Sequence, residues 1–159
     1  MVVVPEVGPL DTRTMLARAL LRALLATVLL ASAALATTNQ PGEVEALGGV
    51  PFTHRFQSTG ATTWHYVEGG DPSGEPVVFL AGLPESWFSF HHQMIDLAPT
   101  HRVIGIDLFG QTVRPDSESF DRIAIANDLI RLVDAIGLGR ANWVSHDWGT
   151  VISDALVGL

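Results

Sequence analysis

The 159-residue sequence contains neither cysteine nor lysine. Without cysteine, the chain can form no disulfide, no thiolate nucleophile and no cysteine-based metal site. All nine basic residues are arginines, no basic cluster stands out beyond the N-terminus, and the formal net charge is −8, which argues against nucleic-acid binding. Glycine fingerprints of P-loop and dinucleotide sites are also absent, so no phosphate cofactor is indicated. We expect no other cofactor and no metal.

Hydrophobic residues make up 47 % of the chain, and some of them form a continuous run near the N-terminus. Two arginines precede this run, Ala23–Ala36, which ends in the small-x-small pattern A-L-A. The pattern predicts a secretory signal peptide over residues 1–36, cleaved after Ala36, for which Met15 is the more ordinary start. The run is shorter than the about 20 apolar residues of a membrane span. A cleaved signal would make the protein secreted or periplasmic. The alternatives for this segment are an uncleaved anchor, which would be the only membrane contact, and a buried amphipathic helix.

The rest of the chain has the composition of one packed domain. Residues 37–48 are polar and turn-rich, as in a linker, and the domain is expected over residues 49–159. Strand patterns, the first two arranged as a hairpin, occupy residues 52–56, 62–68, 76–80, 102–107 and 141–144. Helical patterns occupy residues 86–98, 120–136 and 148–159. This alternation predicts an α/β fold with a mostly parallel sheet and helices on both of its faces.

The stretch S-H-D-W-G, Ser145–Gly149, lies between the last predicted strand and the helix that follows it. Small residues two positions on either side of Asp147 match the nucleophile elbow G-x-S-x-G, with aspartate in the nucleophile's place. A carboxylate is ionised near neutral pH, and a helix N-terminus favours the anion. An aspartate nucleophile suits displacement at the carbon of an epoxide or alkyl halide. The alternatives are that Asp147 is only a helix N-cap or that Ser145 is the nucleophile.

Two motifs in this order, Leu80–Trp87 (L-A-G-L-P-E-S-W) and Ser145–Gly149, carry a family resemblance, together with D-L-F-G at Asp107–Gly110 between them. The chain resembles the epoxide hydrolase and haloalkane dehalogenase branch of the α/β-hydrolase superfamily. The similarity spans roughly Gly49–Leu159, about the first half of such a catalytic domain. It implies an α/β-hydrolase fold that is truncated after the elbow helix, and a small-molecule substrate.

The resemblance also implies residue roles. Asp147 would be the nucleophile, and the backbone N–H groups of Leu83 and Trp148 would form an oxyanion hole. Pro84 and Trp148 would contact the substrate, and the tight turn allows a cis Leu83–Pro84 bond. In the dehalogenases the tryptophan equivalent to Trp148 binds halide through its indole N–H; core packing is the alternative for this side chain.

The motifs depart from the family pattern at three places. Ala81 stands where the family usually has histidine, and the loop after Asp107 is shorter than the family's. Leu83 stands where dehalogenases of the H-G-N-P type have a halide-binding asparagine, so we favour epoxide hydrolase chemistry over dehalogenase chemistry.

A larger departure concerns the base. In the family, the catalytic histidine and its acid follow the nucleophile, after a helical cap. All six histidines of this chain precede Asp147: they are His54, His65, His91, His92, His101 and His146. Without such a base nothing activates water against an ester. We therefore expect epoxide hydrolase chemistry that stops short of turnover. Haloalkane dehalogenase chemistry is one alternative, and a non-catalytic module that associates with a partner through an open sheet edge beside 141–144 is another.

Overall fold

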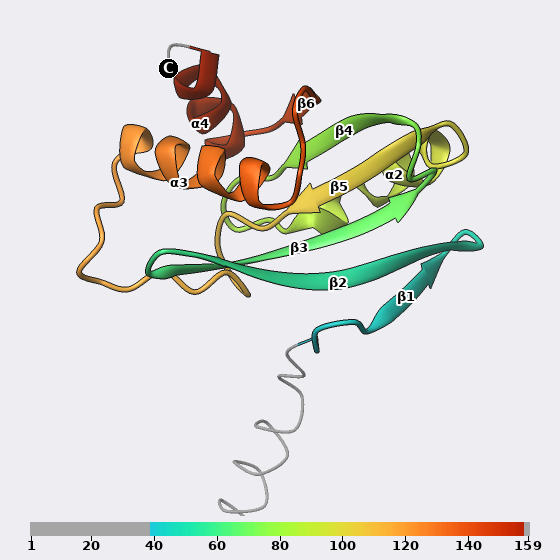
Figure 1. Cartoon of the computed structure of the whole chain (residues 1–159), viewed down its shortest axis with the longest axis horizontal. Helices are drawn as coiled ribbons and strands as arrows, with labels where there is room; N and C mark the ends of the chain where they lie inside the picture. Colours follow the sequence, from blue (N-terminus) through green and yellow to red (C-terminus); the bar gives the residue numbers. More distant parts are fainter. Residues whose placement is uncertain (1–38, 158–159) are drawn as a thin grey trace, which may run out of the picture. The chain divides into compact units, whose positions relative to one another are not determined.

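The sheet of this protein is mixed rather than mostly parallel. The computed structural model describes residues 39–157 (Figure 1), so the predicted signal segment lies outside the described residues. Within that range six strands pair in the order β1-β2-β3-β5-β4-β6. The strands are β1 (Val44–Leu47), β2 (Val50–Thr59), β3 (Thr62–Gly70), β4 (Glu75–Leu80), β5 (His101–Ile106) and β6 (Asn142–Ser145).

Two of the three antiparallel strand pairs, β1–β2 and β2–β3, come from short connections. β1 pairs with β2, β2 with β3 and β3 with β5, all antiparallel. Gly48 and Gly49 both have positive φ, as a two-residue hairpin turn requires, and Gly60 has positive φ in the next turn. The predicted linker, residues 37–48, therefore contributes β1 to the sheet. β4 pairs in parallel with β5 and with β6, and helices connect these strands, as the sequence predicted.

Helices cover both faces of the sheet, which confirms that part of the prediction. They are the short 3₁₀ helix η1 (Trp87–Phe90), α2 (His91–Leu97), α3 (Arg122–Ala135) and α4 (Trp148–Val157). The predicted helix 86–98 is thus two elements. Asp121 caps α3 by accepting bonds from the N–H groups of Ile123 and Ala124. No helix within residues 39–157 is long and apolar enough to cross a bilayer.

The core divides into two layers because successive side chains of a strand point to opposite faces. Val78 and Leu80 of β4 pack on the side of α3 and α4, which lie side by side in Figure 1. Val77 and Phe79 pack on the other side, with Trp87 and Met94 of η1 and α2. β4 and β5 are therefore buried on both faces, as their continuous apolar runs predicted.

Candidate active site

Three loops meet where the parallel strands end. The parallel register places Leu80 of β4 opposite Ile106 of β5 and opposite Ser145 of β6. The loop 81–86, the loop that begins at Asp107 and the elbow at 146–147 consequently leave the sheet at one edge. This carboxyl edge is where open α/β sheets bind ligands.

Asp147 occupies the apex of the turn between β6 and α4 in a left-handed conformation. Its φ is +53°, and it is the one non-glycine residue with positive φ in residues 39–157. Such a conformation costs an L-residue about 1–2 kcal/mol, and strain of this kind is concentrated at functional sites. A Cβ on Gly149 would overlap the carbonyl oxygen of Leu80. The spacing noted in the sequence thus has a packing reason, since α4 can start this close to β4 only with glycine at 149.

The carboxyl group of Asp147 faces two backbone donors. The N–H of Leu83 donates to Oδ2 at 3.0 Å. A Cβ on Gly82 would overlap Oδ2 and lie 2.6 Å from the Trp148 nitrogen, so these groups meet around one point. Hydrogen bonds from the Trp148 N–H and then from the Leu83 N–H hold the pKa of Asp147 below its ordinary value. The structure therefore brings Asp147, Leu83 and Trp148 together around a carboxylate anion.

An apolar cavity of about 280 Å³ lies beside the elbow. Its lining residues are Leu83, Leu108, Phe109, Phe120, Ile125, Trp148 and Ile152. The side chains of Trp148 and Phe120 are nearly half exposed, so neither is buried in the hydrophobic core. The Leu83–Pro84 bond is cis, as the turn allowed. Pro84 itself is exposed and is not among the lining residues, so a substrate contact at Pro84 stays a prediction.

The other polar residues of the elbow point to neighbours other than the carboxylate. The Ser145 hydroxyl lies 2.9 Å from the hydroxyl of Ser153 on α4, which leaves Ser145 at the strand end rather than at the apex. His146 is exposed, and its Nδ1 lies 3.1 Å from Oε2 of Glu85. This contact ties the elbow to the loop 81–86.

A series of buried, hydrogen-bonded polar side chains lies behind the site, and the sequence patterns predicted no role for it. Oδ1 of Asp107 accepts the Trp87 N–H at 2.7 Å, and Oδ2 lies 2.7 Å from Nδ1 of His65. Nε2 of His65 lies 2.9 Å from Nδ1 of His54. A signal existed, since an aspartate ends a buried strand pattern and two histidines lie within other strand patterns. These side chains meet, however, only because β3 lies beside β5, and the strand patterns did not predict which strands are neighbours.

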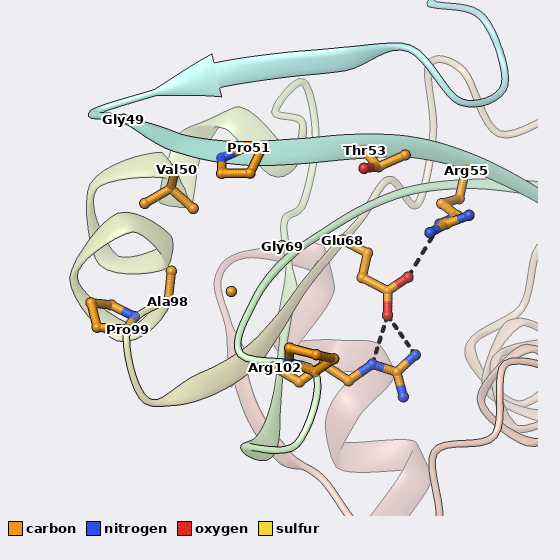
Figure 2. Close-up of a pocket in the computed structure, with 12 residues that line it drawn as sticks. Gly49, Val50, Pro51, Thr53, Arg55, Glu68, Gly69, Ala98, Pro99 and Arg102 are labelled. Atoms are coloured by element: carbon orange, nitrogen blue, oxygen red, sulfur yellow. Dashed lines mark hydrogen bonds and ion pairs between the residues drawn. The ribbon is translucent and has the colours of Figure 1, made fainter.

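A larger cavity, about 530 Å³, lies away from the elbow. Figure 2 shows Glu68 between Arg55 and Arg102. The Nε atoms of these arginines lie 3.2 and 2.6 Å from the Glu68 carboxylate oxygens. Arg102 stands near the start of β5, whereas the loops of the elbow leave the opposite ends of the parallel strands. The three side chains join β2, β3 and β5, and the one carboxylate among the lining residues, Glu68, is paired with both arginines. Volume alone therefore does not make it the reactive site.

Comparison with known proteins places the same region in one family. Residues 75–158 match the family described as alpha/beta hydrolase fold. Epoxide hydrolase A of Mycobacterium tuberculosis is 40 % identical over 109 residues, which is 65 % of this chain and 33 % of that protein. Epoxide hydrolase 2 of Caenorhabditis elegans is 31 % identical over 104 residues, 64 % of this chain and 29 % of that protein. The chain thus spans about a third of the length of these curated relatives.

Solved structures agree with this assignment. The Cfl2 protein of Burkholderia cenocepacia superposes with a TM-score of 0.66 at 31 % identity, over 72 % of this chain and 40 % of that one. The epoxide hydrolase VrEH1 of Vigna radiata superposes with a TM-score of 0.61 at 33 % identity, over 66 % of this chain and 35 % of that one. The matched region contains the fold and the elbow described above.

Proposed function

Because the chain belongs to the alpha/beta hydrolase fold family and is epoxide hydrolase-like, we propose that Asp147 is a nucleophile that opens small epoxides. One observation carries the proposal: a carboxylate stands at the strained apex of the elbow and accepts a backbone N–H across the chain from Leu83. A group that served only as an N-cap would need no donor from a distant loop. The apolar cavity beside it suits an epoxide with a small hydrophobic substituent.

The reaction follows from the arrangement of donors. The oxygen of Asp147 that is not held by Leu83 attacks an epoxide carbon. The carbon–oxygen bond of the ring breaks, the alkoxide takes a proton from water, and a hydroxyalkyl ester of Asp147 remains. Addition of water to this ester would place negative charge on Oδ2, where the N–H groups of Leu83 and Trp148 stabilise it. The same donors favour the carboxylate before attack.

We propose that this chain alone completes only the first half of the reaction. Hydrolysis of the ester needs a base that activates water. All six histidines precede Asp147 in the sequence, and the adjacent His146 directs Nδ1 to Glu85. The expected product is therefore an ester that accumulates on Asp147 rather than a diol released repeatedly.

The test maps the ester. We would incubate the full chain with styrene oxide at neutral pH and digest it with trypsin. Cleavage after Arg140 gives one peptide that contains only two carboxylate side chains, Asp147 and Asp154. We expect one adduct on Asp147, absent in Asp147→Asn and retained in Asp154→Asn, which removes an exposed carboxylate from the same helix. An adduct that persists in Asp147→Asn, or sustained diol release by the chain, would refute the proposal.

Haloalkane dehalogenase chemistry is the second candidate. The observation that favours it is the half-exposed indole of Trp148 on the cavity wall, because an indole N–H can hydrogen-bond a leaving halide. Leu83 offers a backbone donor but no side-chain donor. Stoichiometric bromide release from 1-bromobutane, without an adduct from styrene oxide, would support this candidate over the first.

A non-catalytic module that needs a partner is the third candidate. β6 is one of the two edge strands of the described sheet, and it is short and partly exposed. Sedimentation of the full chain, with its circular dichroism, distinguishes the candidates: a folded monomer shows that no partner is needed. Export is proposed separately from residues 1–36, and N-terminal sequencing of the exported protein would test cleavage after Ala36.

A further inference from the structure

The loop that carries the Leu83 N–H is anchored at both of its ends. Near its start, Gly82 packs against the carboxyl group of Asp147, closer than any side chain would allow. At its end, the Trp87 N–H donates to Oδ1 of Asp107 at 2.7 Å. Between these points the loop holds one internal backbone bond, from the Glu85 N–H to the Gly82 carbonyl, at 3.1 Å. The position of Leu83 thus depends on what holds the Trp87 end.

Asp107 supplies a cap that the local sequence lacks. The helix η1 begins at Trp87, and its N-cap residue, Ser86, makes no side-chain capping bond. The first N–H groups of a helix have no partner within the helix, and a buried unpaired N–H costs about 1–3 kcal/mol. Trp87 is buried, so water does not substitute there. Asp107, twenty residues later in the chain, provides the acceptor.

The second oxygen of Asp107 fixes the direction of the carboxylate. Oδ2 lies 2.7 Å from Nδ1 of His65, and both side chains are almost fully buried. Because a carboxylate only accepts, we assign a proton to Nδ1 of His65, which donates to Oδ2 of Asp107. On the other side of the ring, Nε2 of His65 lies 2.9 Å from Nδ1 of His54. The imidazoles of β2 and β3 therefore hold the Asp107 carboxylate in one orientation.

We propose that Asp107, oriented by His65, is a positioning residue that holds the loop 81–87 so that the Leu83 N–H points at Asp147. The inference rests on the proposed function, because positioning the Leu83 N–H affects a reaction only if Asp147 is the nucleophile. The hydrogen bonds of Asp107 themselves do not depend on any reaction. Bonds to a carboxylate are about twice as strong as bonds between neutral groups, which suits a loop that must keep one donor in place. Asp107 touches neither the cavity nor Asp147, so it acts through Leu83.

NMR can detect the contact between the Leu83 N–H and the Asp147 carboxyl group directly. In the full chain we would follow the amide signals of Leu83 and Trp148 while Asp147 is titrated. Both amides should respond in the wild type. In Asp107→Ala the response of Leu83 should fall by at least half and its hydrogen exchange should quicken about tenfold, the equivalent of one lost hydrogen bond. Trp148 should respond as before, because it belongs to the elbow itself.

Two further variants keep the test decisive. Asp107→Asn retains the side-chain volume and one acceptor, so it should fold and give an intermediate response of Leu83. Asp128→Asn is the matched control: Asp128 is also buried, but its partners are Thr62, Arg114 and Arg131, outside the loop. It should leave the Leu83 response unchanged. If Asp107→Ala does not fold, Asp107→Asn decides.

Two results would overturn the inference: an unchanged Leu83 response in a folded Asp107 variant, or an equal loss in Asp128→Asn. The rate of Asp147 alkylation by styrene oxide separates this inference from the proposed function. A wild type that is not alkylated, with the Leu83 response reduced in Asp107→Asn, refutes the function and leaves the positioning role. Alkylation of the wild type with an unchanged Leu83 response in Asp107→Asn refutes the positioning role alone.

Discussion

The Leu83 N–H donates to Oδ2 of Asp147 at 3.0 Å although 64 residues separate them in the chain. The contact joins the loop after β4 to the elbow after β6, and the parallel pairing of these two strands makes it geometrically available. With the Trp148 N–H it holds the pKa of the Asp147 carboxyl below its ordinary value.

The pH dependence of Asp147 alkylation should be set by the carboxyl group itself. The carboxylate is the nucleophile, and its pKa lies below the ordinary value of 3.8. The alkylation rate should therefore be constant through neutral and mildly acid pH and fall only below pH 3.8. Mass spectrometry of the full chain at timed intervals, from pH 3 to 8, measures this. A loss of rate near pH 6 would contradict the account, because it would show that another group must be deprotonated.

Gly149→Ala should distort the elbow. A Cβ there would overlap the carbonyl oxygen of Leu80, and overpacking of this kind costs about 1–3 kcal/mol. Urea unfolding should show a loss in that range, together with slower alkylation of Asp147. Gly139→Ala is the control, since its Cβ would meet nothing within 4 Å and its backbone is not left-handed. Equal stabilities of the two variants would show that α4 can shift away from β4 without cost.

His54 should make stability fall in weakly acid solution. Burial, then the neighbouring His65, lower the pKa of His54 from its ordinary value of 6.5, while Glu45 and Glu43 oppose the change. The unfolded chain therefore takes up a proton before the folded one does. The free energy of unfolding should decrease as the pH falls below 6.5, by at most about 1.4 kcal/mol per pH unit, until folded His54 also titrates.

The measurement is urea unfolding between pH 5 and pH 8 for the wild type and His54→Gln. The variant should lose this part of the slope, whereas His92→Gln, which removes an exposed imidazole, should keep it. Besides His65 and the two glutamates, His54 contacts the Asn39 amide and the ring of Trp87. A slope that is identical in the wild type and in His54→Gln would contradict the assignment.

Arg114→Ala should destabilise the wall of the cavity. Arg114 forms a buried ion pair with Asp128 of α3, and its guanidinium lies 5.6 Å from the ring centre of Phe120, a lining residue. Removing one partner of a buried pair typically costs about 3–5 kcal/mol; we expect the lower end because Arg131 also contacts Asp128.

Arg55→Ala provides the comparison for Arg114→Ala. It breaks an ion pair with Glu68 in which half of the arginine side chain is exposed, and such pairs contribute about 1 kcal/mol or less. Both variants would be measured by urea unfolding. Similar losses of stability in the two variants would show that the buried Arg114–Asp128 pair stabilises the protein no more than the exposed Arg55–Glu68 pair does.

The elbow could be read from the sequence because its rules are local. Small residues around Asp147 and an apolar strand before it are sufficient to place the turn, and the Leu83–Pro84 pair is sufficient to allow the cis bond. The strand order could not be read in this way. β1 is a short segment, V-E-A-L, with little hydrophobic pattern, and it becomes a strand only because β2 offers it an edge. The buried pair of Asp107 and His65 depends on that same order, across 42 residues of chain.

The most direct test of the central claim combines adduct mapping with an isotope. The full chain is incubated with excess styrene oxide in ¹⁸O-labelled water, and the peptide that follows Arg140 is sequenced by mass spectrometry. The account predicts a hydroxyalkyl ester on Asp147, no more than one equivalent per chain, and no ¹⁸O in the Asp147 carboxyl. Asp147 without an adduct and without ¹⁸O would contradict its role as nucleophile, and ¹⁸O in the carboxyl together with released diol would contradict the half-reaction.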